Sequence, residues 1–132
     1  MRSARVELRT YIVEDNATIR ANLIDALREL ASVAPLGWAE TENDAKAWMA
    51  AHPGAWDLLI VDLFLKQGSG MGVLECTQTR GREQRVVVLS NYATADIRKR
   101  CAQLGADAVF DKSNEIDALV DYCLAISGRP AA

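Results

Sequence analysis

The apolar residues of this chain alternate between two spacings along its whole length. Continuous or alternating apolar runs are typical of strands, and apolar residues that recur every three or four positions are typical of helices. The expected strands cover residues 6–13, 36–40, 57–63, 85–90 and 108–111. A helical pattern follows each strand, and the third helix is expected over residues 71–79. This strict alternation predicts an α/β fold with a doubly wound, five-stranded parallel sheet and five helices on its two faces.

Capping residues mark where the helices should begin. Asn16, Thr94 and Ser113 each precede a helical pattern, and residues 41–44 resemble a capping box. We expect three sets of side chains to lie in the core or half-buried. They are the helix residues Ile19, Leu23, Leu27 and Leu30, the tryptophans Trp38, Trp48 and Trp56, and the cysteines Cys76, Cys101 and Cys123.

The length and composition exclude several classes of protein. With 132 residues the chain has room for one domain, whose core we expect over residues 6–126, with a loose tail at 128–132 and no output domain. The net charge of −3 argues against direct binding of nucleic acid. Three cysteines without a C-x-x-C pair argue against a disulfide framework or zinc site. The apolar runs are far shorter than the ~20 residues of a membrane span, so we expect no membrane insertion and a cytoplasmic location.

Polar side chains gather where the expected strands end. Glu14 and Asp15 follow the first strand, Asp62 the third, Ser90 the fourth and Lys112 the fifth. Because ligands of a doubly wound sheet bind at the carboxyl ends of its strands, these side chains mark the candidate site.

The carboxylates of this candidate site need a compensating charge. Two carboxylates about 4 Å apart repel by ~4 kcal/mol at an effective dielectric of roughly 20. Asp62 directly follows the apolar run 58–61, where a carboxylate without a partner is costly. A raised pKa or a divalent cation would relieve the repulsion, and magnesium suits one or two carboxylates together with a phosphate.

Four segments of the chain resemble the receiver domain of bacterial two-component response regulators. Residues 11–16 resemble the first strand with its acidic pair, and residues 58–63 resemble the phosphoacceptor strand. Residues 86–91 resemble the strand that ends in a hydroxyl residue, and residues 105–113 the segment that carries the lysine. The resemblance implies a flavodoxin-like sheet with strand order 2-1-3-4-5.

The resemblance also implies a role for each site residue. Asp62 would accept a phosphoryl group from a histidine kinase, a histidine phosphotransfer protein or a small phosphodonor, giving an aspartyl phosphate. Lys112 would neutralise the phosphoryl charge, and Ser90 would hydrogen-bond a phosphoryl oxygen. Mg²⁺ or Mn²⁺ would bind Asp62 and three further groups. These are the carboxylates of Glu14 and Asp15 and the backbone carbonyl of Phe64.

A receiver domain acts through other proteins, so we expect no turnover of an external substrate. Phosphorylation would change the surface formed by the fourth helix, the last strand and the last helix, and thereby its affinity for a downstream protein. In this family the same face can form a homodimer.

Three positions depart from the family pattern. Lys66 stands where the family usually has proline, and Asn91 where it usually has a small residue. Val109 replaces the switch aromatic that precedes the lysine, and Phe110 should point to the opposite face of its strand. Tyr92 is therefore our candidate for a gating ring.

Three other functions compete with this interpretation. Residues 68–72 (Gly-Ser-Gly-Met-Gly) lie between a strand and a helix, as a phosphate-binding loop of a nucleotide-binding domain would. An aspartyl-phosphate phosphatase would need a second acid where Phe64 stands. A degenerate receiver would bind proteins without phosphorylation, and Val109 favours it, although Asp62 and Lys112 are both present.

Overall fold

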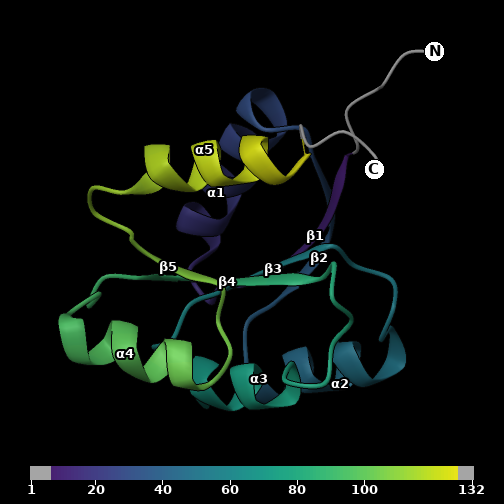
Figure 1. The fold of residues 1–132 in the computed structure, drawn as a ribbon, viewed down its shortest axis with the longest axis vertical. Helices are drawn as coiled ribbons and strands as arrows, with labels where there is room; N and C mark the ends of the chain where they lie inside the picture. The colour runs from purple at the N-terminus through teal and green to yellow at the C-terminus, as the bar shows by residue number, and fades with distance from the viewer. Residues whose placement is uncertain (1–6, 128–132) are drawn as a thin grey trace.

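A computed structural model describes residues 7–127, which form a three-layer α/β sandwich (Figure 1). The strands are β1 (Leu8–Val13), β2 (Val33–Ala39), β3 (Leu58–Val61), β4 (Arg85–Ser90) and β5 (Ala108–Asp111). The helices are α1 (Ala17–Leu30), α2 (Glu42–Ala51), α3 (Gly70–Cys76), α4 (Ala95–Gln103) and α5 (Ile116–Ser127). All paired strands are parallel, in the order β2-β1-β3-β4-β5. The predicted fold class and strand order are confirmed, while the tail at 128–132 lies outside the described residues.

Three of the predicted caps are present. The side chains of Asn16, Thr41 and Thr94 accept hydrogen bonds from backbone amides in the first turns of α1, α2 and α4. The prediction for Ser113 was wrong, because α5 begins only at Ile116. The Ser113 N–H instead donates to the Asp111 carboxylate, so this serine lies in a turn after β5.

Several elements differ in length from the prediction, among them β3, which covers Leu58–Val61 rather than residues 57–63. β2 begins at Val33 and pairs with β1 from its first residue, although Pro35 lies within it. Proline is tolerated there because β2 is an edge strand. α3 ends at Cys76 rather than at residue 79, because Thr77 caps it and its hydroxyl donates to the Leu74 carbonyl at 2.8 Å.

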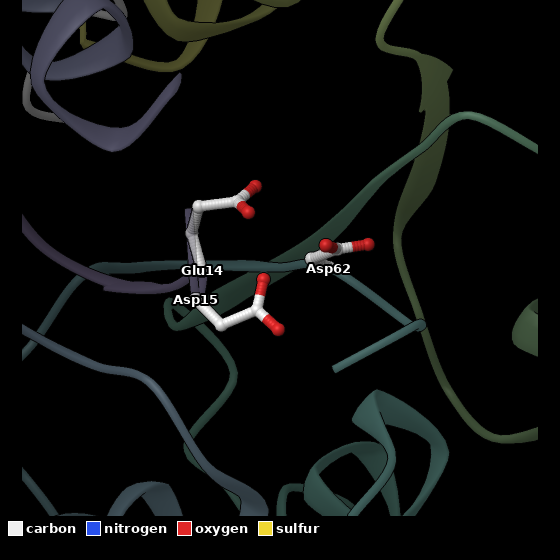
Figure 2. Close-up of side chains that lie close together, drawn as sticks. All are labelled: Glu14, Asp15 and Asp62. Atoms are coloured by element: carbon white, nitrogen blue, oxygen red, sulfur yellow. The ribbon is translucent and has the colours of Figure 1, made fainter. Parts of the chain in front are cut away.

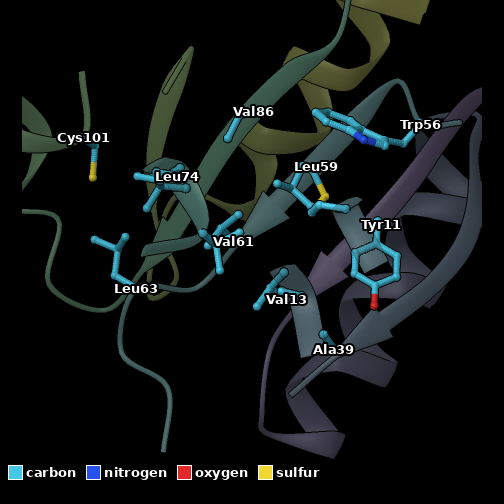
Figure 3. Close-up of a cluster of buried hydrophobic side chains, with 14 residues drawn as sticks. Tyr11, Val13, Ala39, Trp56, Leu59, Val61, Leu63, Leu74, Val86 and Cys101 are labelled. Atoms are coloured by element: carbon cyan, nitrogen blue, oxygen red, sulfur yellow. The ribbon is translucent and has the colours of Figure 1, made fainter. Parts of the chain in front are cut away.

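The sheet separates two hydrophobic clusters. α1 and α5 cover one face, and α2, α3 and α4 cover the other (Figure 1). The cluster on the face covered by α2, α3 and α4 includes Trp56, Leu59 and Val61, which pack against α2 and α3 (Figure 3). Val109 belongs to this cluster and Phe110 to the opposite one, as strand alternation predicts. No helix within residues 7–127 is long and apolar enough to cross a membrane.

Some residues expected in the core are exposed. Ile19 and Leu30 on α1 are 37% and 57% exposed, whereas Leu23 and Leu27 on the same helix are buried in the cluster on that face of the sheet. Trp38 is 52% exposed because it lies on the edge strand, where its ring stacks on the guanidinium of Arg20.

The three cysteines do not share one environment. Cys76 is exposed because α3 ends there, whereas Cys101 and Cys123 are buried. Burial raises the pKa of the Cys123 thiol to about 12, so this thiol stays protonated near neutral pH.

Candidate functional site

Two neighbouring strands bring the acidic residues together. β1 and β3 pair in register from Thr10 with Leu58 to Val13 with Val61, and the Asp62 N–H donates to the Val13 carbonyl at 2.9 Å. Glu14, Asp15 and Asp62 therefore leave the sheet side by side (Figure 2). One carboxylate oxygen from each lies within 4.8 Å of the others. This is the acidic cluster predicted from the strand ends.

Lys112 reaches this cluster from the opposite side of β3. Its backbone N–H donates to the Ser90 carbonyl at 3.0 Å, which continues the pairing of β4 with β5. Its Nζ lies 2.6 Å from Glu14 Oε1 and 3.0 Å from Asp62 Oδ2. All three side chains are at most 8% exposed, so this is a buried ionic network.

Burial and charge shift the pKa values within this network. Burial raises the pKa of Glu14, the hydrogen bond from Lys112 opposes that change, and the charge of Asp62 adds to it. Burial alone would lower the pKa of Lys112, but its hydrogen bonds to Glu14 and Asp62 outweigh this effect and raise it. Lys112 is therefore a fixed positive charge beside two carboxylates.

The donor set suits a hard divalent cation. Carboxylate oxygens from three residues converge, and Asp15 is partly exposed and so accessible from solvent. Magnesium prefers such oxygen ligands and retains several waters. Receiver domains bind Mg²⁺ in an acidic pocket of this composition. The contribution of the Phe64 carbonyl remains a prediction.

The loop after β3 contacts the acidic cluster through its backbone. The Phe64 N–H donates to Asp62 Oδ1 at 3.2 Å, and the Lys66 N–H donates to Asp15 Oδ2 at 2.6 Å. The sequence drew attention to the Lys66 side chain, but the contact with the site is made by its amide.

The side chain of Ser90 has a hydrogen-bond partner outside this ionic network. It is fully buried at the end of β4, and its Oγ accepts a hydrogen bond from the Tyr92 N–H at 3.1 Å. Within the described residues, no hydrogen bond joins Ser90 Oγ to Asp62 or Lys112. The hydroxyl thus orders the β4–α4 loop.

Tyr92 packs on Phe64 at the rim of the site. Their rings meet edge to face with centroids 5.1 Å apart, and both side chains are more than half exposed. Each ring lies two residues beyond a site residue, Asp62 or Ser90, so the pair bridges the two loops that flank the acidic cluster.

Arg98 has a role that spacing along the chain does not indicate. The helical pattern only places it on α4, but its guanidinium donates to the carbonyls of Ala93 and Val109 at 2.9 and 2.8 Å. It also pairs with Glu115 at 2.8 Å, and the same carboxylate oxygen accepts from the Asp111 N–H. Arg98 therefore ties the β4–α4 loop to β5 and to the residue before α5.

The glycine-rich loop does not form a phosphate cradle. The Ser69 N–H, which precedes α3, donates to the Glu42 carboxylate at 2.8 Å. An anion placed at this amide would have to displace that carboxylate and would be repelled by it. This geometry therefore argues against the interpretation of residues 68–72 as the phosphate-binding loop of a nucleotide-binding domain.

Comparison with known proteins identifies the fold and the family. Residues 10–123 match the family model of the response regulator receiver domain. The photosynthetic apparatus regulatory protein RegA of Cereibacter sphaeroides is 27% identical over 114 residues, which cover 86% of this chain and 60% of that protein. The chain thus spans about 60% of the length of this curated relative.

Solved structures share the fold at low identity. The receiver domain of the NarL response regulator of Mycobacterium tuberculosis superposes with a TM-score of 0.78 at 22% identity, covering 93% of this chain and 98% of that one. A LuxR-family response regulator from Aurantimonas gives a TM-score of 0.81 at 19% identity, covering 96% and 90% of the two chains.

Proposed function

The chain belongs to the response regulator receiver family, and we propose that Asp62 is its phosphoacceptor. One observation carries the proposal: the Asp62 carboxylate lies beside Lys112 on one side and the carboxylates of Glu14 and Asp15 on the other. An anionic group arriving at Asp62 would meet a fixed cation, and the clustered oxygens offer a place for a divalent metal.

The proposed reaction is transfer of a phosphoryl group to the carboxylate of Asp62. A carboxylate oxygen attacks phosphorus as the bond to the donor breaks. The donor is a phosphohistidine, whose nitrogen leaves, or a small acyl phosphate, whose carboxylate leaves. An Asp62 aspartyl phosphate forms, and water later hydrolyses it to aspartate and inorganic phosphate. The domain assists its own phosphorylation and dephosphorylation without turning over another substrate.

The neighbouring residues stabilise charge in this reaction. Lys112 Nζ lies 3.0 Å from Asp62 Oδ2. It would bind the phosphoryl group and neutralise the negative charge that builds up on that group during the transfer. Bound Mg²⁺ would neutralise phosphoryl oxygens and orient the transferred group. Glu14, Asp15 and Asp62 supply its carboxylate ligands, and the Phe64 carbonyl is the proposed backbone ligand.

The proposed switch would pass through the β4–α4 loop. Rotation of the Ser90 hydroxyl toward a phosphoryl oxygen would break its hydrogen bond from the Tyr92 N–H, which holds that loop. Tyr92 would then move against Phe64 as the gating ring, in place of an aromatic at Val109.

The proposed partners follow from this chemistry. The phosphodonor would be a histidine kinase or histidine phosphotransfer protein in the cytoplasm. A downstream protein, or a second copy of this chain, would bind the face formed by α4, β5 and α5. We propose no direct contact with nucleic acid.

Intact mass after incubation with acetyl phosphate and magnesium tests the acceptor. Wild type should gain one phosphoryl group only with magnesium, and Asp62→Asn should gain none. A gain in both proteins would show that Asp62 is not the acceptor. No gain in wild type, together with no response to beryllofluoride, would favour a degenerate receiver that binds proteins without phosphorylation.

A further inference from the structure

Glu42, the first residue of α2, holds the loop between β3 and α3 at two points. Its backbone N–H donates to the Gln67 carbonyl at 3.2 Å, and its carboxylate accepts from the Ser69 N–H at 2.8 Å. Lys46, one turn further along α2, pairs with the other carboxylate oxygen at 2.6 Å. A hydrogen bond to a charged acceptor is stronger than one between neutral groups. Residues 67–69 are therefore fixed to a helix that contributes no side chain to the acidic cluster.

The glycines of this loop leave the space that Glu42 fills. A Cβ on Gly72 would collide with the carboxylate of Glu42, and a Cβ on Gly68 would collide with its side-chain stem. Gly68 also has φ +85°, a conformation that other residues rarely adopt. The close approach of Glu42 thus accounts for Gly68 and Gly72, whereas a Cβ on Gly70 would collide with the backbone of Asp62 and Leu63.

The same loop carries the two amides that contact the acidic cluster. Phe64 and Lys66 bind the carboxylates of Asp62 and Asp15 through their N–H groups. The loop closes on itself, because the Gly70 N–H donates to the Leu63 carbonyl at 3.0 Å and Phe64 pairs with Ser69 in an isolated bridge. Ser69, which Glu42 holds, is therefore directly paired with Phe64, whose N–H contacts the proposed acceptor Asp62.

We propose that Glu42 is a positioning residue for the phosphorylation site. By holding Ser69, it fixes Phe64 and Lys66, and their amides fix the orientation of Asp62 and Asp15, two of the three carboxylates that would bind Mg²⁺. This inference rests on the proposed function. Groups that orient metal ligands typically change metal affinity by about ten- to a hundredfold when they are removed.

Two measurements test this inference in parallel. Calorimetric titration gives the Mg²⁺ affinity, and amide hydrogen exchange of the metal-free protein reports on Ser69. Glu42→Ala should weaken Mg²⁺ binding about tenfold and accelerate exchange at Ser69. Glu42→Gln should keep most of the Mg²⁺ affinity and most of the protection of Ser69 from exchange, because the glutamine amide oxygen still accepts from the Ser69 N–H. Lys46→Met removes the ion pair, leaves the Ser69 hydrogen bond, and should have the smallest effect.

Gly72→Ala is the matched test that leaves Glu42 in the chain. The new methyl group should expel the Glu42 carboxylate and reproduce the loss of Mg²⁺ affinity. In the Glu42→Ala background the same change should cause no further loss, since the space is then empty. Gly54→Ala is the control, because a Cβ there meets no atom within 4 Å.

The outcomes separate this inference from the proposed function. Wild-type Mg²⁺ affinity in Glu42→Ala, or additive losses in the double variant, would overturn the role of Glu42 while leaving Asp62 as the acceptor. A wild-type protein that binds no Mg²⁺ would overturn both. Weakened binding in Glu42→Ala and in Gly72→Ala, with no additional loss in the double variant, would support the inference.

Discussion

The acidic half and the switch half of the proposed phosphorylation site are built in different ways. In the acidic half, Glu14, Asp62 and Lys112 follow three strands, and Lys112 Nζ contacts the two carboxylates directly, at 2.6 and 3.0 Å. In the switch half, Ser90 Oγ accepts from the Tyr92 N–H, and the Arg98 guanidinium joins the Ala93 carbonyl to the Val109 carbonyl, so every link has a backbone group as one partner. In the proposed function, the buried charges that follow the strands would carry the phosphoryl chemistry, and the β4–α4 loop would carry the response.

The physical reason lies in burial. The acidic half is enclosed, so each charge there requires a close partner. The Arg98–Glu115 pair is partly exposed, with side-chain exposures of 41% and 36%, and it costs less to break. Changes in the acidic half should therefore destabilise the fold, whereas changes in the switch half should affect the response to phosphorylation.

The largest expected effect follows from removing the cation of the acidic half. Lys112→Met leaves the buried carboxylates of Glu14 and Asp62 without their cationic partner, which typically costs about 3–5 kcal/mol. We expect the free energy of unfolding in urea to fall by about this amount at neutral pH. Lys99→Met, an exposed position on α4, is the control. Equal effects of the two substitutions would contradict the contrast between buried and exposed charge.

A smaller effect is expected from cutting the link in the switch half. Arg98→Leu removes hydrogen bonds to Ala93 and Val109 and should cost about 1 kcal/mol after allowing for exposure. Phosphorylation by acetyl phosphate should persist, because Arg98 does not contact the acidic cluster.

Amide chemical shifts before and after addition of beryllofluoride measure the relay through Arg98. In wild type the shift changes should extend into α4 and β5, and in Arg98→Leu they should stop at the β4–α4 loop. Arg100→Leu is the control on the same helix. An Arg98→Leu protein that is no longer phosphorylated would show that the two halves are not separable.

The gating ring should produce a still smaller change in stability. An edge-to-face aromatic pair contributes about 0.5–1.5 kcal/mol when buried, and the Tyr92–Phe64 pair is exposed, so we expect the lower end for Tyr92→Ala. The shift changes caused by beryllofluoride in the β4–α4 loop should shrink in Tyr92→Ala and persist in Tyr92→Phe. An unchanged pattern in Tyr92→Ala would remove Tyr92 from the switch.

The smallest expected effect is a pH dependence of the switch half. The hydrogen bond from Arg98 holds the pKa of Glu115 below its ordinary value of 4.5. Stability from this pair is therefore present above pH 4.5 and is lost as the pH falls through the lower pKa of the folded state. The difference in Tm between wild type and Arg98→Leu should shrink over that range. A Tm difference that stays constant with pH would show that Arg98 stabilises the protein through packing rather than through its charge.

Much of the fold and the acidic half was predictable from local patterns. Each carboxylate follows a strand that could be recognised from its apolar run, and the parallel order places all strand ends at one edge. The predictions failed at Leu30, Trp38 and Cys76, whose exposure depends on where an element meets the edge of the sheet. Spacing along the chain carries no information about that edge.

The sequence by itself determined the alternation of strands and helices and the positions of Asp62 and Lys112 at strand ends. Only the tertiary structure decided what holds the loops around them. Glu42 meets Ser69 across 27 residues of chain, and Arg98 meets Glu115 across 17. Helical and strand periods describe neighbours a few residues apart, whereas these contacts arise from how the helices pack on the sheet.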